Sequence, residues 1–297
     1  MQRRSGLPSE GIVLLCVVVL GWGSSWAVIK YALTALPPLS YRGLTSLLGG
    51  LLTLALMRAR GHSLGVPRED RARLAWLAFF NVLAWNVLSS YATLNLPSGR
   101  AALLAYTMPL WCVPLSAWLL GSVVDARRVL ALALGCAGVL VLLGRTALDL
   151  AHAPVGVLLM LSAALSWATG VVLMKRWSLR LDAAVFTGWV LVLGGLPQVL
   201  AALVVDGVPA RLPDGGAIAA IAFSVLITVM LCNWAWNRLV LLVPVEVSSL
   251  SSLLTPLVGV ASGALFLGEQ PGWREAAAAA LIVSAVAVIN LRPKARA

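Results

Sequence analysis

A few polar and aromatic residues interrupt the long apolar stretches of this chain, and their spacing places them on shared helical faces. Asn81, Trp85 and Ser89 follow at intervals of four residues, with Asn86 and Tyr91 on neighbouring faces of the same stretch. An amide inside a membrane is costly unless neighbours or water satisfy it, so these side chains should face the protein interior or a wet cavity. Rings and amides together can bind a small molecule by stacking and hydrogen bonding.

Other apolar stretches carry the same residue types. Trp22 and Trp26 lie one turn apart, and Ser248 and Ser251 belong to a hydroxyl stripe that includes Ser252 and Thr255. Such a stripe serves helix packing as readily as a cavity. The predicted substrate-binding set consists of Trp22, Trp26, Asn81, Trp85, Asn86, Tyr91, Tyr106, Trp167, Asn233, Trp236, Asn237, Ser248 and Ser251.

Other kinds of chemistry have little support in the sequence. There is no Ser-His-Asp set, no HExxH motif and no intramembrane carboxylate pair, so an enzyme is disfavoured. His62 and His152 fall in polar connectors, and the four cysteines are scattered through apolar runs, which predicts reduced thiols. We therefore expect no metal and no cofactor.

Charged residues lie toward the ends of the apolar stretches, and this limits the substrate. The relevant residues are Lys30, Arg42, Arg100, Arg238, Glu246 and Glu269. Without a central carboxylate a proton antiporter is disfavoured, and without a cationic cavity a carrier of phosphates or nucleotide sugars is disfavoured. The sequence predicts a neutral or zwitterionic substrate.

The composition requires a membrane protein. Of 297 residues, 61% are hydrophobic and 11% charged, so a soluble domain could not hide this chain from water. The net charge of +11 resides mostly in short connectors, which indicates topology and no nucleic-acid partner. Ten stretches are long enough to cross a bilayer, at about 10–33, 39–58, 74–95, 98–120, 127–144, 154–174, 183–205, 215–238, 245–267 and 273–291.

The chain repeats itself after 145 to 147 residues. Trp22, Lys30 and Leu48-Gly49-Gly50 recur as Trp167, Lys175 and Leu193-Gly194-Gly195, and Asn86, Pro109 and Arg127 recur as Asn233, Pro256 and Arg274. The first stretch carries part of this repeat, so it is not a cleaved signal peptide. We predict an all-α membrane protein of ten transmembrane helices, built from two five-helix repeats, residues 1–147 and 148–297. An odd number of spans in each repeat inverts the second relative to the first, around a central cavity in one compact body.

Two further expectations follow from this plan. Pro109 and Pro256 fall mid-span at equivalent positions and are predicted hinges, although a static kink explains them equally well. With the N-terminus inside, 16 of the 22 basic residues lie in cytoplasmic connectors, so both termini are predicted to be cytoplasmic. Both repeats lie in one chain, which makes a monomer sufficient.

The order of several short motifs resembles the ten-segment exporters of the drug/metabolite transporter superfamily. These motifs are Trp22-Gly-Ser-Ser, Arg42, Tyr91-Ala92, Pro109, Trp236-Asn237, Pro256 and Leu267-Gly268-Glu269. Within the superfamily the chain is most similar to the YddG-type amino-acid exporters of the bacterial inner membrane. The resemblance implies a cavity formed by segments one, three, four, six, eight and nine, with Trp22, Tyr106, Trp167, Trp236 and Asn237 among its residues.

We therefore expect a transporter that exports amino acids, aromatic and other neutral ones among them, by alternating access. Two alternatives stay open from the sequence. Aromatic cavities also attract quaternary ammonium groups, which would suit efflux of drug-like cations. A membrane receptor or scaffold that does not transport is the alternative from a different class.

Overall fold

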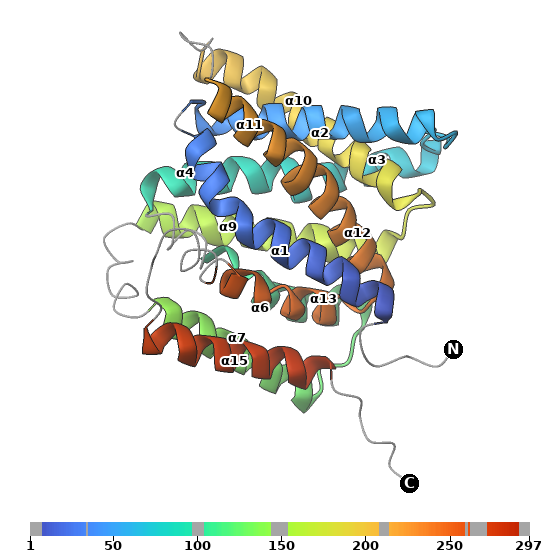
Figure 1. The fold of residues 1–297 in the computed structure, drawn as a ribbon. Helices are drawn as coiled ribbons and strands as arrows, with labels where there is room; N and C mark the ends of the chain where they lie inside the picture. Colours follow the sequence, from blue (N-terminus) through green and yellow to red (C-terminus); the bar gives the residue numbers. More distant parts are fainter. Residues whose placement is uncertain are drawn as a thin grey trace.

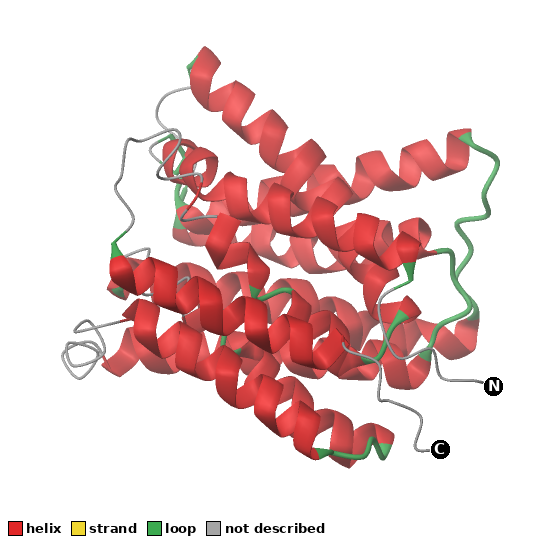
Figure 2. Cartoon of the chain, turned by 60° about the horizontal axis from the view of Figure 1, so that its bottom comes forward, coloured by secondary structure: helices red, strands yellow, loops and turns green. Residues whose placement is uncertain are grey.

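The computed structural model describes residues 8–33, 35–96, 104–143, 154–207, 214–258, 261 and 272–290, and all regular elements in these residues are helices (Figures 1 and 2). The first half contains α1 (Ser9–Ala32), α2 (Pro38–Ala59), the continuous run of α3 (Arg68–Ala78), η1 (Phe79–Ala84) and α4 (Trp85–Asn95), then α6 (Met108–Leu120) and α7 (Ala126–Leu143). The second half contains α9 (Pro154–Trp177), α10 (Ala183–Val205), the continuous run of α11 (Gly215–Phe223), η3 (Ser224–Leu231) and α12 (Cys232–Leu242), then α13 (Val245–Ser251) and α15 (Trp273–Asn290).

Each of the ten predicted segments contains helix in its described residues, which confirms the all-α fold. In the described part of the chain, five helices are long and apolar enough to cross a membrane: Pro38–Ala59, Arg68–Asn95, Pro154–Trp177, Ala183–Val205 and Gly215–Leu242. The third and eighth segments are longer than predicted. As a result Arg68, Arg71, Arg73 and Arg238, expected in connectors, lie within helical turns.

Equivalent helices of the two halves run in opposite directions. Glu10 at the start of α1 pairs with Arg238 on α12 (Nε to Oε1, 2.9 Å). Lys175 near the end of α9 donates to the backbone oxygen of Val240, at the same end of α12. The start of α1 and the end of α9 therefore meet on one side of the molecule, which we call the Glu246 side after the residue at the start of α13. The start of α1 and the end of α15 both lie on this side (right in Figure 1). This is the inverted arrangement of an odd-numbered repeat.

The repeated Leu-Gly-Gly motifs pack the two halves against each other. A Cβ atom at Gly50 on α2 would lie 2.8 Å from the backbone oxygen of Gly188 on α10, and one at Gly195 on α10 would lie 2.7 Å from the backbone nitrogen of Leu47. Only glycine allows such close approach of two helix backbones. In Figure 1, α2 and α10 form one pair at the top of the bundle, and α7 and α15 form another at the bottom.

Both long composite helices contain a π-helical stretch that the sequence pattern did not reveal. η1 and η3 occupy equivalent places in the two repeats. Each offers a backbone oxygen to the opposite half: Phe80 O accepts from Ser166 Oγ (3.0 Å), and Thr228 O accepts from Trp22 Nε1 (3.1 Å). Such π-helical turns are often found at functional sites.

The fourth and ninth segments are interrupted at equivalent positions. Residues 106–107 form a turn before α6, and residues 252–253 form a turn between α13 and a further helical stretch, 254–258. Pro109 is the second residue of α6, and Pro256 lies in the first turn of residues 254–258. Each proline thus follows a break and lies in the first turn of the helix after it. Proline is tolerated there because the backbone N–H groups of a first turn make no intrahelical hydrogen bonds.

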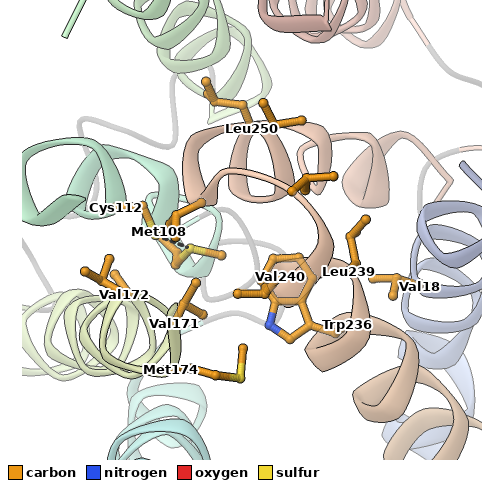
Figure 3. Close-up of a cluster of buried hydrophobic side chains, with 14 of the residues drawn as sticks. Val18, Met108, Cys112, Val171, Val172, Met174, Trp236, Leu239, Val240 and Leu250 are labelled. Atoms are coloured by element: carbon orange, nitrogen blue, oxygen red, sulfur yellow. Dashed lines mark hydrogen bonds between the residues drawn. The ribbon is translucent and has the colours of Figure 1, made fainter. Parts of the chain in front are cut away.

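An apolar core fills the bundle on the Glu246 side of its centre. Trp236 lies in the middle of it, 2% exposed, surrounded by side chains from four other helices (Figure 3). We call this set the Trp236 core: Val18, Met108, Cys112, Val171, Val172, Met174, Trp236, Leu239, Val240 and Leu250. The outer surface is also apolar, with Val204 86% and Trp118 79% exposed, as expected for helices that face lipid.

Candidate functional site

A cavity of about 130 Å³ lies where the two halves meet. It is bounded by helices from both repeats, namely α1, α2, η1, α4, α9, α10, η3 and α12, and by the two interrupted segments. Its lining residues are Trp22, Ser25, Arg42, Thr45, Ser46, Asn81, Val82, Trp85, Asn86, Ala105, Tyr106, Trp167, Leu191, Thr228, Val229, Asn233 and Ser252. An engineered cavity of about 150 Å³ in another protein holds one benzene ring, so this space suits a small molecule.

Tryptophan rings form one wall of the cavity. The centroid of Trp167 lies 4.9 Å from that of Trp85 and 5.6 Å from that of Trp22. Trp236 packs behind them, 5.4 Å from Trp167, and joins this wall to the Trp236 core. These separations are in the range of favourable ring pairs, so the wall is preorganised.

Amides on opposite walls are held in different ways. Asn86 Nδ2 donates to Ser46 Oγ (3.1 Å), and Asn233 Nδ2 donates to the backbone oxygen of Val229 (2.9 Å) in the π-helical stretch. Asn81 Nδ2 and Thr228 Oγ1 are buried and have no hydrogen-bond partner among the residues that the structure describes. A buried polar group without a partner is costly, so these two atoms are suited to contact a bound molecule.

Arg42 also lines this cavity, contrary to the expectation that no cation reaches it. It is the fifth residue of α2, and it is half-buried. The hydropathy pattern placed Arg42 near a span end, which is correct. However, α2 begins beside the central cavity, and an arginine side chain is long enough to extend from a helix end into it.

The structure brings together seven of the predicted residues at the cavity and separates the others from it. Those that line it are Trp22, Asn81, Trp85, Asn86, Tyr106, Trp167 and Asn233. Tyr91 is 36% exposed on the outer surface, and Trp236 lies behind the tryptophan wall. Asn237 faces α10, where Nδ2 donates to Thr187 Oγ1 (2.9 Å). The side chain of Trp26 lies outside the described part of the chain.

Of the hydroxyl stripe on the ninth segment, Ser252 lines the cavity, and the predicted Ser248 and Ser251 do not. Ser248 and Ser251 are fully buried away from the cavity, and Ser248 Oγ donates to the backbone oxygen of Val245 (3.0 Å). Ser252 lines the cavity because it belongs to the turn that interrupts the segment. Thr45 and Ser46, one turn after Arg42, were also missed. Their spacing from Arg42 was the signal that could have found them.

The Glu246 side of the cavity is closed. The Trp236 core fills the bundle there, and beyond it Arg128 Nη1 lies 3.3 Å from Glu246 Oε1. Lys175 Nζ donates to the backbone oxygens of Val240, Leu241 and Val243 at 2.7–3.1 Å, which fixes the end of α9 to the end of α12. Access therefore has to come from the opposite side, where α2 begins.

In the described residues no group of three or more His, Cys, Asp or Glu is arranged to hold a metal ion.

Known proteins share this plan. An inner membrane transporter of Escherichia coli, YedA, is 27% identical over 98% of this chain and 93% of its own length, and its function is uncharacterized. A probable amino-acid metabolite efflux pump of Escherichia coli (strain K12) is 26% identical over 91% of this chain and 89% of its own length. A protein of known crystal structure superposes with a TM-score of 0.82 at 24% identity, covering 95% of this chain and 97% of that one, which shows a common fold.

The family comparison detects the internal repeat as two separate matches. The model of the EamA-like transporter family matches residues 9–144 and again residues 154–291. These two matches cover both sets of helices that enclose the cavity, and they confirm the resemblance to the drug/metabolite transporter superfamily. The chain therefore belongs to the EamA-like transporter family.

Proposed function

We propose that this transporter exports amino acids, aromatic and other neutral ones, across the bacterial inner membrane by alternating access. The observation that carries the proposal is the central cavity, in which Trp22, Trp85 and Trp167 face amides and hydroxyls from the opposite walls. Rings can contact a substrate side chain, while the polar walls bind its amino-acid group. The relative named as a probable amino-acid metabolite efflux pump supports this substrate class.

The size of the cavity supports a small substrate. Pockets for drug-sized ligands usually measure about 300–1,000 Å³, whereas this cavity measures about 130 Å³. One aromatic ring or a short aliphatic side chain suits that space, and several fused rings do not. The dimensions thus favour amino acids over drug-like cations, although the tryptophan wall would attract either.

The inverted repeats supply a route to alternating access. In the present state the Glu246 side is closed by the Trp236 core and by the pair of Arg128 and Glu246. If the two repeats exchange conformations, the opposite side closes and the Glu246 side opens. The equivalent breaks at residues 106–107 and 252–253, next to Pro109 and Pro256, are the places where we expect the helices to bend.

The same proposal fixes the orientation in the bilayer. The start of α1 and the end of α15 lie on the Glu246 side, and the sequence assigns 16 of the 22 basic residues to the same side as these two helix ends, so this side is proposed to face the cytoplasm. The structure then represents a state closed toward the cytoplasm. The repeats, proposed as residues 1–147 and 148–297, enclose the cavity within one chain, so a monomer suffices.

Uptake by liposomes tests the proposal. Purified protein is reconstituted, and entry of radiolabelled phenylalanine, threonine and glutamate is compared with empty liposomes. We expect saturable uptake of phenylalanine and threonine, and a loss of about tenfold or more in Trp167→Ala, because this ring joins the contacts of Trp22 and Trp85. Trp118→Ala is the matched control, since Trp118 is 79% exposed on the outer surface.

Two results would contradict the proposal. Uptake of quaternary ammonium compounds without any amino acid would assign the cavity to cation efflux. No uptake of either class above empty liposomes would favour a receptor or scaffold.

A further inference from the structure

The cavity has one charged wall, and its charge is unbalanced. Among the described residues that line it, Arg42 is the only charged one, and no carboxylate accompanies it. The Arg42 guanidinium makes no hydrogen bond or ion pair with any residue in the part of the chain that the structure describes. A cation held in a membrane protein interior without a counter-charge is costly, and such residues commonly mark substrate pathways.

The nearby acidic residue does not neutralise Arg42. Asp206 at the end of α10 packs against the start of α2, where its Oδ2 accepts from Ser40 N (2.9 Å) and from Ser40 Oγ (2.6 Å). No ion pair joins Asp206 to Arg42 within the described residues. Asp206 thus fixes the first turn of α2, and Arg42 keeps its charge available to the cavity.

Neighbouring side chains complete a site for a carboxylate. Thr45 and Ser46 follow Arg42 at i+3 and i+4, so the three side chains share one face of α2, and all three line the cavity. Ser46 Oγ accepts a hydrogen bond from Asn86, which leaves the hydroxyl proton of Ser46 able to donate. A guanidinium binds a carboxylate with two parallel hydrogen bonds, and a hydroxyl donor beside it can contact the same group.

The tryptophan wall determines what the rest of the ligand must be. It provides apolar surface and ring faces from Trp22, Trp85 and Trp167. An apolar side chain bound there would leave its carboxylate to be met by the polar wall of α2. The cavity contains no acidic residue for an ammonium group among the described residues, so ammonium has only amides, hydroxyls and backbone oxygens as partners.

We propose that Arg42 is the carboxylate-binding residue of this cavity, so that the transporter selects small molecules by their carboxylate and rejects amines of the same size. This inference rests on the proposed function for the location of the substrate site. It names the group by which that site recognises its substrate. Amino acids satisfy it, and so do small aromatic or aliphatic acids without an ammonium group.

Three single-ring compounds distinguish the two charged groups of an amino acid. The experiment measures how much each unlabelled compound inhibits uptake of labelled phenylalanine into liposomes. The compounds are phenylalanine itself, 3-phenylpropionate, which lacks the ammonium group, and phenethylamine, which lacks the carboxylate. We expect phenylalanine and 3-phenylpropionate to compete at similar concentrations and phenethylamine to need at least about tenfold more. Equal competition by phenethylamine would overturn the proposal.

Variants on α2 assign the effect to Arg42. A hydrogen bond to a charged group contributes about 1.5–3 kcal/mol, so Arg42→Gln should weaken competition by 3-phenylpropionate about 10- to 100-fold. Arg42→Lys keeps the charge without the planar fork, and we expect an intermediate loss. Arg58→Gln is the control, because Arg58 is an exposed arginine at the other end of the same helix. Unchanged competition in Arg42→Gln would overturn the proposal.

A binding measurement separates this proposal from the proposed function. Quenching of tryptophan fluorescence by 3-phenylpropionate and by phenethylamine is titrated in purified wild type and in Arg42→Gln, with unfolding midpoints as the folding control. One outcome is that amino acids are not transported, 3-phenylpropionate binds, and Arg42→Gln abolishes the binding of 3-phenylpropionate. That result would support the carboxylate site and contradict amino-acid export. If phenethylamine binds as well as 3-phenylpropionate, or if Arg42→Gln folds and binds the acid like wild type, the carboxylate site fails.

Discussion

Three basic residues at the Glu246 side of the bundle have partners, whereas the basic residue at the central cavity has none among the described residues. Arg128 lies beside Glu246, Arg238 beside Glu10, and Lys175 donates to three backbone oxygens. Arg42 lines the cavity without such a contact in the described residues. The paired charges hold helix ends together, and the unpaired charge is available to a ligand. Burial alone therefore does not distinguish a structural charge from a functional one; its partners do.

The amides follow the same division. Asn237 is hydrogen-bonded to Thr187 and faces away from the cavity, whereas Asn81 Nδ2 lines the cavity and lacks a partner among the described residues. Asn237 lies toward the Glu246 end of the eighth span, next to Arg238, whereas Asn81 lies in the middle of the third span. One connects two helices of the second repeat, and the other is free to contact a substrate.

The largest effect on stability is expected from breaking the buried pair at the Glu246 side. Glu246 is 3% exposed and the Arg128 side chain 14%, so Glu246→Ala removes the counter-charge of a largely buried guanidinium, whose Nη1 keeps only the backbone oxygen of Val123 among the described residues. Loss of one partner of a buried pair costs about 3–5 kcal/mol, which we expect as a lowered free energy of unfolding in mixed detergent micelles. Glu10→Ala is the control, since its pair with Arg238 is exposed and contributes about 1 kcal/mol or less. Equal losses in the two variants would contradict the comparison.

A medium effect should separate the two asparagines. Asn81 packs against Gly170 of α9 but its Nδ2 has no hydrogen-bond partner among the described residues, so we expect Asn81→Ala to raise the KM for phenylalanine about fivefold with little change in the unfolding midpoint. Asn237→Ala leaves Thr187 with one contact fewer and should cost about 1 kcal/mol of stability with little change in KM. Uptake kinetics and unfolding measured on both variants check this prediction. A reversed pattern would show that the substrate binds closer to Asn237.

The smallest effect should come from the serines of the ninth segment. Ser252 lines the cavity, and we expect Ser252→Ala to raise the KM for phenylalanine two- to threefold, the effect of about 0.5 kcal/mol. Both serines donate to a backbone oxygen three residues earlier, but Ser248 does not line the cavity, so Ser248→Ala should leave uptake unchanged. Parallel uptake curves for the two variants provide the measurement. A larger effect of Ser248→Ala would favour a continuous helix in place of the turn at residues 252–253.

Much of this plan is predictable from the sequence, because the bilayer makes strong demands on composition. The lengths of the apolar stretches predicted ten membrane-spanning segments. The recurrence of Trp22 as Trp167, together with the repeated Leu-Gly-Gly motifs, predicted the two repeats. Amides are so costly in lipid that their presence pointed to the interior, and Asn81, Asn86 and Asn233 do line the cavity.

The parts that were not predictable depend on local backbone geometry. A helical face is inferred on the assumption of regular α-helical turns, and η3 and the turn at residues 252–253 break that regularity. Asn237 lies one turn beyond the cavity-lining Asn233 and contacts α10, and the turn brings Ser252 to the cavity in place of Ser248 and Ser251. The direction of the Arg42 side chain is likewise not encoded in hydropathy, which records only its distance from the span end.

The most direct test compares the two arginines in one experiment. Arg42→Gln and Arg128→Gln are reconstituted beside wild type, and the KM for phenylalanine uptake and the unfolding midpoint are measured on the same preparations. We predict that Arg42→Gln raises KM at least about tenfold with an unchanged midpoint, and that Arg128→Gln lowers the midpoint with KM within about twofold of wild type. An unchanged KM in Arg42→Gln, or the larger change of KM in Arg128→Gln, would contradict the assignment of the central cavity and its unpaired charge to substrate binding.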